Sequence, residues 1–296
     1  MQDPTVTVVI PTFNRLALLR EAVESVKAQT FHDWELLVVD DGSTDHTAEY
    51  VQAEQDQRID LIRSVHCGIV GAVRNLGVSH ARGRFVAFLD SDDLWKPTKL
   101  EAQMTALKSR GAQWSYTGYE LVDDSGRSLK QFMAAQPKEA TILYQLLTTE
   151  ASAAMGSVLV AKDLIDRCGG FSTEPALQCR EDHDLVLRLA SAAHPSVVSE
   201  VLVAIREHRG RTTHSLSDPF LSTATVYERF MARGGDKKSM RIARRMMARH
   251  MISSARLDLS HGQLEDAVMK LRDTIRPGWC SARWWWTWTL VARARF

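Results

Sequence analysis

Three aspartates follow a short hydrophobic segment in the first third of the chain. The segment Phe85–Leu89 is apolar throughout and continues into Asp90, Ser91, Asp92 and Asp93. Three carboxylates within about 5 Å repel one another by roughly 3 kcal/mol per pair at an effective dielectric near 20. A Mg²⁺ or Mn²⁺ ion that bridges to a phosphorylated ligand would offset this repulsion. The alternative is a solvated aspartate-rich turn, and the local sequence leaves both interpretations open.

Two further polar segments also come directly after predicted strands. Pro11–Arg15 follows the β-branched run Thr5–Ile10, and Asp40–Asp45 follows the apolar run Trp34–Val39. Open α/β proteins bind their ligands at the carboxyl ends of parallel strands. We therefore expect these two segments and the aspartate cluster to lie side by side in one crevice.

Helical periodicity alternates with the strands over the first 205 residues, which predicts an α/β fold with helices on both faces of a parallel sheet. From Asp123 to Ala161 the pattern is less regular. After about Ser217 it is helical throughout, so we place a boundary there. The predicted helices are Leu16–Ala28, a segment from Thr44 or Asp45 to Gln55, Ala72–Ala81, Thr98–Ser109, Asp163–Arg167 and Arg180–Ala193. The other predicted strands are Ile59–Arg63, Trp114–Tyr119, Val158–Val160 and Ser196–Ile205.

Composition narrows the class of protein. The 296 residues are 45% hydrophobic and 25% charged, which is ordinary for a globular protein with a sizeable core. A formal net charge of +1 gives no reason to expect a nucleic-acid partner. The four cysteines show no C-x-x-C spacing, which favours a reducing compartment over a zinc site or a disulfide framework. We find no signal-peptide pattern and no apolar run of about 18 residues, so a cytoplasmic location is expected.

Five short motifs, in order, carry a resemblance to a known family. They are P-T-F-N-R at Pro11–Arg15, V-V-D-D-G-S-T-D at Val38–Asp45, G-A-V-R-N-L-G at Gly71–Gly77, L-D-S-D-D at Leu89–Asp93 and E-D-H-D-L at Glu181–Leu185. Over about 210 residues the chain resembles the inverting family 2 glycosyltransferases of GT-A fold. The resemblance implies a Rossmann-like, mostly parallel central sheet with flanking helices in residues 1–216. A nucleotide-sugar half (about 1–110) would precede an acceptor half (about 111–216), and residues 217–296 would form a helical C-terminal extension.

The resemblance also implies which residues bind the nucleotide. Pro11 and Phe13 would lie against the base, with the Phe13 ring stacked on it. Asp41 would accept the base N–H, although an aspartate before Gly42 is also typical of a turn. Arg74 would pair with the diphosphate or with carboxylates near the base, and its alternative is an arginine on a helix surface.

A metal site is implied at the D-x-D pair. Asp90 would contact ribose or metal, and Asp92 would hold the Mn²⁺ or Mg²⁺ ion that bridges both phosphates. Asp93 could instead cap the next segment. His208 follows the last predicted strand and is a candidate metal or phosphate contact, with a surface-loop histidine as the simpler interpretation.

The catalytic base is expected at the E-D motif. At 100° per residue, Asp182 should point to the middle of the apolar stripe formed by Leu185, Val186 and Leu189, and Glu181 should lie to one side. A buried carboxylate at a helix start is costly unless it is used or paired, although helix capping is an alternative. By resemblance, Asp182 would deprotonate the acceptor hydroxyl, and Glu181 would orient the acceptor or Asp182.

The C-terminal region is basic and rich in tryptophan. Met247, Met251 and Ala255 recur at helical spacing among several arginines, and a W-W-W-T-W run begins at Trp284. Tryptophan and arginine suit the headgroup region of an anionic membrane, so this tail could bind a membrane surface. Packing on the catalytic domain and contact with another protein are the alternatives.

These features predict a metal-dependent inverting glycosyltransferase for polysaccharide biosynthesis. It would move a hexosyl group from a nucleotide-diphosphate sugar, UDP-sugar favoured, to a hydroxyl of a lipid-linked or cell-surface glycan precursor. The enzyme would be cytoplasmic or peripheral on the cytoplasmic face of the membrane. The alternatives are a non-catalytic nucleotide-sugar-binding or membrane-scaffold protein that keeps the fold, and a phosphotransferase with Asp90 as the nucleophile.

Overall fold

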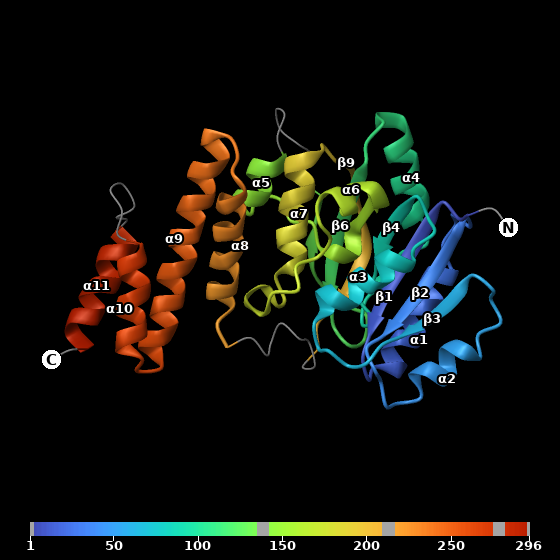
Figure 1. Cartoon of the computed structure of the whole chain (residues 1–296), viewed down its shortest axis with the longest axis horizontal. Helices are drawn as coiled ribbons and strands as arrows, with labels where there is room; N and C mark the ends of the chain where they lie inside the picture. Colours follow the sequence, from blue (N-terminus) through green and yellow to red (C-terminus); the bar gives the residue numbers. More distant parts are fainter. Residues whose placement is uncertain (1–2, 135–141, 209–216, 275–281, 295–296) are drawn as a thin grey trace. The chain divides into compact units, whose positions relative to one another are not determined.

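The computed structural model describes residues 3–134, 142–208, 217–274 and 282–294. The chain divides into two compact units, Met1–Arg211 (unit 1) and Thr212–Phe296 (unit 2). Figure 1 shows that unit 1 contains a strand-rich core with helices around it, and that the described part of unit 2 is helical.

Within the described residues, unit 1 is built on one sheet of nine strands with the order β3-β2-β1-β4-β8-β6-β9-β5, and β7 pairs with β6. β3, β2, β1 and β4 are mutually parallel, which confirms the predicted α/β fold around a central sheet. The other half is mixed, because β5, β7 and β8 join it through antiparallel pairs. The strands are β1 (Val6–Thr12), β2 (Trp34–Asp40), β3 (Ile59–Arg63), β4 (Phe85–Phe88), β5 (Leu94–Trp95), β6 (Trp114–Val122), β7 (Ser128–Phe132), β8 (Val158–Ala161) and β9 (Ser196–Arg206).

The helices of unit 1 lie close to their predicted positions. Two strands and one helix, β5, β7 and α5, were not predicted; β5 has two residues, and the other two fall in the irregular stretch after Asp123. The helices are α1 (Leu16–Lys27), α2 (Thr47–Gln52), α3 (Val70–His80), α4 (Lys99–Arg110), α5 (Ile142–Thr148), α6 (Lys162–Arg167) and α7 (Glu181–Ala192).

A glycine allows helix α3 to pack directly against the sheet. A Cβ at Gly77 would come within 2.5 Å of Val9 Cγ1 on β1 and 3.1 Å of Val39 Cγ2 on β2. Only glycine permits this approach without displacing the valines. Every residue of β1 and β2 is buried, so these strands are a rigid base for α3 and for Arg74 on its second turn.

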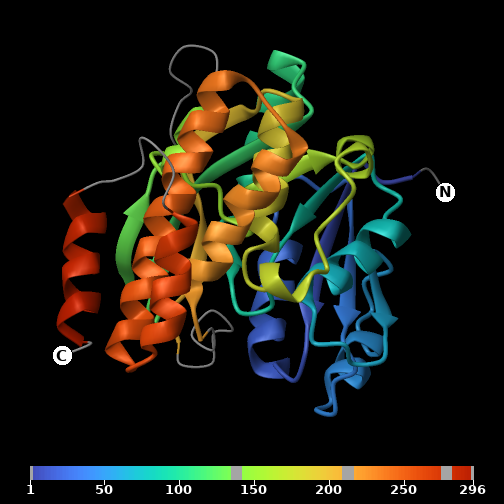
Figure 2. The same ribbon diagram turned by 60° about the vertical axis from the view of Figure 1, so that its left-hand side comes forward.

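Unit 2 consists of α8 (Pro219–Arg233), α9 (Lys237–Ser260), α10 (Leu264–Asp273) and α11 (Ala282–Ala294). Figure 2 shows α8, α9 and α10 as neighbouring helices, in agreement with the contacts α9 makes with both. Asp218 and Asp236 cap α8 and α9 by accepting backbone N–H groups of the first turns. In the part of the chain that the structure describes, no helix is long and apolar enough to cross a membrane.

A small core joins the last three helices of unit 2. Trp284 and Val291 of α11 are buried against Ile252 of α9 and Leu271 of α10. Trp284 Nε1 donates a hydrogen bond of 3.0 Å to Thr274 Oγ1. One side of the tryptophan-rich tail therefore packs within unit 2 rather than remaining in solvent.

Candidate active site

The three polar segments predicted at strand ends do meet at one edge of the sheet. β1 lies between β2 and β4, and Thr12 is opposite Asp40 in the β1–β2 register. The Asp41 amide donates to the Thr12 carbonyl at 2.9 Å, and the Leu89 amide donates to the Val9 carbonyl at 3.1 Å. The three polar segments thus lie side by side at the carboxyl ends of parallel strands, as the sequence predicted.

Asn14 connects the first polar segment to the second. Its Oδ1 accepts the backbone N–H groups of Thr44 at 2.8 Å and Asp45 at 3.3 Å, and its own N–H donates to Ser43 Oγ at 2.9 Å. Asn14 has φ = 50°, a conformation that asparagine tolerates better than most residues. These bonds fix the backbone from which the neighbouring side chains, Phe13 and Arg15, extend.

Asp41 organises the loop after β3. Its carboxylate, 4% exposed, accepts the N–H groups of Cys67 and Gly68 at 2.9 Å each, and His66 Nδ1 lies 2.8 Å from Oδ2. Burial opposes ionisation of this carboxyl, but the two backbone donors, the Cys67 thiol and the nearby His66 together outweigh it and hold the pKa of Asp41 below its ordinary value. Asp40, by contrast, serves its own turn, since its Oδ1 accepts the Ser43 amide at 2.8 Å.

Phe13 stacks on His66 in this structure. The two ring centroids are 3.9 Å apart at an interplanar angle of 14°, and Phe13 is 37% exposed. Pro11 is buried at the end of β1. The roles of Pro11, Phe13 and Asp41 toward a base remain predictions, but all three belong to one edge of the crevice.

Arg74 lies at the centre of the site and is 4% exposed, so it is not the surface arginine of the alternative interpretation. Nη2 donates to Asp90 Oδ1 at 2.6 Å and Nη1 donates to Glu181 Oε1 at 2.7 Å. Burial favours the neutral guanidine, but the two carboxylates outweigh it and raise the pKa of Arg74. For Glu181 the balance is opposite: burial raises its pKa, against the opposing effect of Arg74.

Asn75 anchors the segment that leads into α7, a role that sequence reasoning did not assign. Its side-chain amide donates to the Phe171 carbonyl at 2.9 Å and accepts the Phe171 amide at 2.8 Å. A Cβ at Gly71 would lie 2.3 Å from the Ser172 carbonyl oxygen, so only glycine fits there. The family motif around Arg74 therefore positions both the arginine and the start of α7.

Asp92 and Asp93 are also held by groups from distant parts of unit 1. Asp92 Oδ2 accepts Arg15 Nη1 at 2.6 Å and lies 3.0 Å from His208 Nε2. Asp93 Oδ1 accepts the backbone N–H of Arg206 at 3.0 Å. Protein groups thus already offset the repulsion expected among the aspartates, and a cation is not required for that purpose.

The donor set at Asp92 nevertheless fits part of a divalent-cation site. A carboxylate oxygen and an imidazole nitrogen 3.0 Å apart match two neighbouring ligands at about 2.1 Å from one ion. Across the described residues, no cluster of three or more His, Cys, Asp or Glu side chains is arranged to hold a metal. A cation here would need oxygens from a ligand, which is how Mg²⁺ is usually bound beside phosphates.

The predicted orientation of the E-D motif is wrong. Glu181 is buried at 6% exposure, whereas Asp182 is partly exposed and Asp184 occupies the buried face at 1%. The prediction from helical periodicity assumed that the first turn of α7 packs against the hydrophobic core. Instead this turn lies beside Arg74, whose guanidinium pairs with Glu181 and so favours burial of Glu181. Asp182 remains accessible to a second substrate, and its catalytic role remains a prediction.

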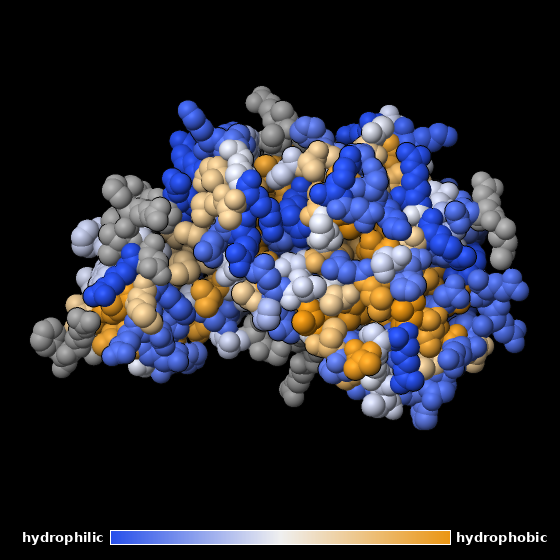
Figure 3. Space-filling view, in the orientation of Figure 1, coloured by the Kyte–Doolittle hydropathy of each residue, from blue (hydrophilic) through white to orange (hydrophobic). Residues whose placement is uncertain are grey.

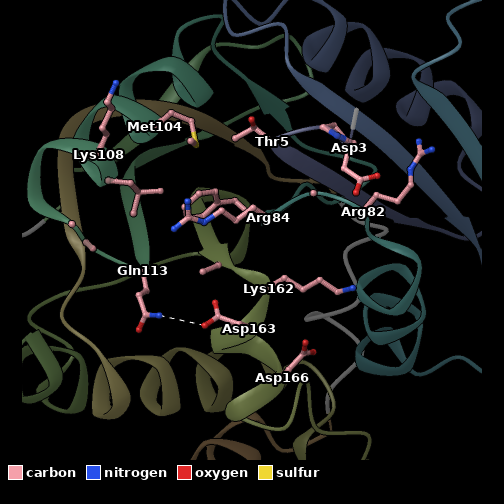
Figure 4. A pocket seen from close by; sticks show the side chains of 17 residues that line it. Asp3, Thr5, Arg82, Arg84, Met104, Lys108, Gln113, Lys162, Asp163 and Asp166 are labelled. Atoms are coloured by element: carbon pink, nitrogen blue, oxygen red, sulfur yellow. Dashed lines mark hydrogen bonds between the residues drawn. The ribbon is translucent and has the colours of Figure 1, made fainter. Parts of the chain in front are cut away.

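The opposite edge of the sheet has a separate hollow of about 1060 Å³. Figure 4 shows Thr5, Arg84 and Lys162 around it, next to the amino ends of β1 and β4. None of the predicted site residues lines this hollow. The candidate active site is therefore the motif-bearing edge.

Comparison with known proteins identifies the family. Residues 7–163 match the sequence profile of Glycosyl transferase family 2, which is more than half of the chain. The chain belongs to Glycosyl transferase family 2. This confirms the resemblance, and the matched region contains the motifs at Phe13, Asp41, Arg74, Asp90 and Asp92.

Two bacterial relatives have names that state a function. The family 2 chain is 38% identical over 134 residues to TuaG of Bacillus subtilis, named as a teichuronic acid biosynthesis glycosyltransferase. It is 35% identical over 136 residues to WfgD of Escherichia coli, a UDP-Glc:α-D-GlcNAc-diphosphoundecaprenol β-1,3-glucosyltransferase. The matches cover 45% and 46% of this chain and 53% of each relative, so the chain spans about half the length of these curated relatives.

Solved structures confirm the GT-A fold. Residues 1–349 of S. aureus TarS, in complex with UDP-GlcNAc, align with 91% of this chain and 80% of that one at a TM-score of 0.72 and 21% identity. The mannosyltransferase PcManGT of Pyrobaculum calidifontis, in complex with GDP-Man and Mn²⁺, aligns with 100% and 82% at a TM-score of 0.62 and 18% identity. At this level of identity the likeness concerns the fold alone.

Proposed function

We propose that this family 2 glycosyltransferase is metal-dependent and inverting, and that it transfers a hexosyl group from a UDP-sugar to a hydroxyl of a lipid-linked or cell-surface glycan precursor. The observation that carries the proposal is the guanidinium of Arg74, which joins Asp90 of the D-x-D motif to Glu181 of the E-D motif. The donor-side and base-side motifs therefore converge on one point.

Residues of one rim would bind the donor. Phe13 offers a partly exposed ring, and Asp41 keeps a buried carboxylate ionised at the same rim. Asp92 and His208, with Asp90 nearby in sequence, are the residues that would hold Mn²⁺ or Mg²⁺. When bound, the cation would neutralise negative charge on the departing nucleoside diphosphate. The name of WfgD gives UDP-Glc as its donor, which favours a UDP-sugar for this chain.

Asp182 would act as the general base. It is partly exposed at the amino end of α7, one residue from the carboxylate that Arg74 anchors. It would accept the proton of the acceptor hydroxyl while that oxygen attacks the anomeric carbon from the face opposite the leaving diphosphate. A single displacement of this kind inverts the anomeric configuration. Glu181 would position the first turn of α7 through its bond to Arg74.

The relatives and unit 2 support a proposal for the acceptor and for the location of the enzyme. WfgD is named for action on a diphosphoundecaprenol-linked sugar, and TuaG is named for teichuronic acid biosynthesis, so a lipid-linked acceptor is favoured. We propose that the enzyme works on the cytoplasmic face of the membrane and contacts it through α9 and α11. Arg241, Arg245 and Arg249 are exposed on one face of α9 at i, i+4 spacing.

The same face of α9 continues to α11. Arg256, seven residues after Arg249, donates to Thr287 Oγ1 at 2.9 Å and stacks 4.5 Å from the Trp286 ring centre. Trp285 and Trp286 are 60% and 55% exposed. Figure 3 shows hydrophobic residues at the surface over α10 and α11, beside hydrophilic ones. Exposed tryptophans next to arginines are suited to an anionic headgroup layer.

A panel of sugar nucleotides tests the proposal. Thermal unfolding and slow hydrolysis are measured with each donor, with Mn²⁺ or after EDTA treatment. We expect one UDP-sugar to raise the melting temperature in the presence of metal only, and transfer to a diphosphoundecaprenol-linked sugar to give a product of inverted anomeric configuration by NMR. Equal stabilisation after EDTA would refute metal dependence. Tight donor binding without any hydrolysis or transfer would favour the non-catalytic alternative, and family membership already disfavours the phosphotransferase.

A further inference from the structure

The two carboxylates of the D-x-D motif are each paired with an arginine, but the two pairs differ. Arg74, which holds Asp90, has a side chain only 5% exposed and also binds Glu181. Arg15, which holds Asp92, has a side chain 26% exposed. Arg74 is therefore locked into the protein interior, whereas the Arg15 side chain is partly exposed to solvent.

Arg15 occupies the carboxylate that a cation would need. Its Nη1 lies 2.6 Å from Asp92 Oδ2, the same oxygen that lies 3.0 Å from His208 Nε2. A divalent ion on Asp92 would be placed within a few ångströms of the guanidinium charge, and the two would repel each other. Arg15 and the cation therefore compete for Asp92.

The backbone around Arg15 is fixed, so only its side chain is able to change partners. The Arg15 carbonyl accepts the Leu19 amide at 2.9 Å at the start of α1, and the preceding Asn14 is pinned to the Thr44 amide. The side chain extends from the end of β1 to a rim where a diphosphate would lie next to Asp92. A guanidinium matches phosphate oxygens as well as carboxylate oxygens.

We infer that Arg15 closes the metal site in the absence of donor and moves to the diphosphate when the donor binds. The guanidinium neutralises Asp92 in the empty enzyme and so disfavours binding of a cation alone. A nucleoside diphosphate offers Arg15 a second anionic partner, and this frees Asp92 for the cation. Donor and metal then bind as a cooperative pair. This inference rests on the proposed function, because it requires a cation and a diphosphate at this rim.

The test uses Arg15→Gln in the full chain and measures binding rather than turnover. Mn²⁺ affinity without nucleotide is measured by EPR of the free ion, and UDP affinity in EDTA by calorimetry. We expect R15Q to bind Mn²⁺ about 10-fold more tightly, which lies within the usual range of coupling between sites, and to bind UDP several-fold more weakly. Opposite changes for the two ligands are the signature, because a simple distortion of the rim would weaken both.

Two further variants make the test specific. Arg15→Lys keeps the charge but loses the planar fork, so its two affinities should fall between those of wild type and R15Q. Arg20→Gln removes an exposed arginine of α1 that stacks on Tyr50 instead, and should change neither affinity. If wild type binds Mn²⁺ with UDP but R15Q leaves both affinities unchanged or weakens both, the inference is wrong and the proposed function stands. If wild type binds no Mn²⁺ even with UDP, the proposed metal dependence fails as well.

Discussion

Arg74 and Glu181 lie 107 positions apart in the sequence, yet their side chains form a hydrogen bond of 2.7 Å in a buried site. Arg74 is on the second turn of α3, and Glu181 begins α7. Because the other nitrogen of the same guanidinium holds Asp90, the position of the E-D motif depends directly on the D-x-D loop. The guanidinium of Arg74 thus sets how the D-x-D loop on the donor side and the E-D motif on the catalytic-base side lie relative to each other.

Removal of the Arg74 guanidinium should destabilise unit 1. Arg74→Gln leaves the buried Glu181 carboxylate without its partner, and breaking a buried pair from one side typically costs about 3–5 kcal/mol. We expect a loss of that size in the free energy of unfolding by urea. The control is Arg127→Gln, whose guanidinium is 78% exposed and pairs with Asp123 at the surface, where less than about 1 kcal/mol is expected. Similar losses for both variants would show that the Arg74 bridge contributes little.

The two acids of the E-D motif should respond differently to neutralisation. Asp182→Asn should lower kcat by about 10²- to 10⁴-fold, because the general base is lost, while donor affinity stays the same. Glu181→Gln should lower thermal stability and shift the donor affinity, because the bond to Arg74 loses its charge. Kinetics and donor titrations on both variants distinguish the roles. Retained turnover in D182N together with inactive but stable E181Q would assign the base to Glu181.

Asp41 should contribute a pH-dependent part of the stability. Its folded-state pKa lies below the ordinary 3.8, so the unfolded chain binds the proton more readily. The contribution is therefore complete above pH 3.8 and is lost as the pH falls through the lower folded value. We expect Asp41→Asn to cost about 1–3 kcal/mol near neutral pH, as two backbone donors lose a charged acceptor.

Urea unfolding of wild type and D41N over a pH series checks this prediction. The difference in the free energy of unfolding should be constant from about pH 7 to pH 5 and should shrink below pH 3.8. Asp60→Asn, which alters an exposed carboxylate on β3, is the matched control. A difference between wild type and D41N that grows toward acid pH would contradict the assigned direction of the shift.

The sequence was sufficient for the parts of the fold that depend on local pattern. Apolar runs that end in polar motifs located β1, β2 and β4, and strand parallelism then brought Asp41 and Asp90 to one edge. It was insufficient where partners are distant in the chain. Arg15 is part of the P-T-F-N-R motif, but the sequence predicted no function for it, because its partner Asp92 is 77 positions away. The available signal for such a role was the positive charge of Arg15, directly after Asn14, in a site predicted to be rich in aspartates.

Local periodicity also misled at the start of α7. A helical wheel assumes that the apolar stripe of the later turns defines the buried face of the whole helix. Here the first turn lies beside Arg74 rather than beside the core, so Glu181 is buried and Asp182 is not. Charge pairing across elements decided the burial of this turn. The wheel contains no information about such a partner.

The proposed membrane surface of unit 2 leads to the last prediction. The double variant Trp285→Ser/Trp286→Ser removes the two most exposed tryptophans of α11, and the triple variant R241Q/R245Q/R249Q removes the basic face of α9. Each basic residue near an anionic surface contributes about 1 kcal/mol, so the triple variant should bind vesicles about 100-fold more weakly. Binding is measured by sedimentation with phosphatidylcholine vesicles with and without phosphatidylglycerol.

Wild type should sediment with the anionic vesicles and be released by salt, because its charges are exposed. The double variant should lose binding while its melting temperature falls only slightly, because Trp285 and Trp286 are more than half exposed and Trp284, not these two, belongs to the buried cluster. Met269→Ser, at a position 57% exposed on α10, is the control for a general loss of surface hydrophobicity and should bind like wild type. Equal binding of all variants, or equal binding to neutral vesicles, would refute this surface. A lower melting temperature for W285S/W286S without any loss of vesicle binding would instead assign these tryptophans to packing within the protein.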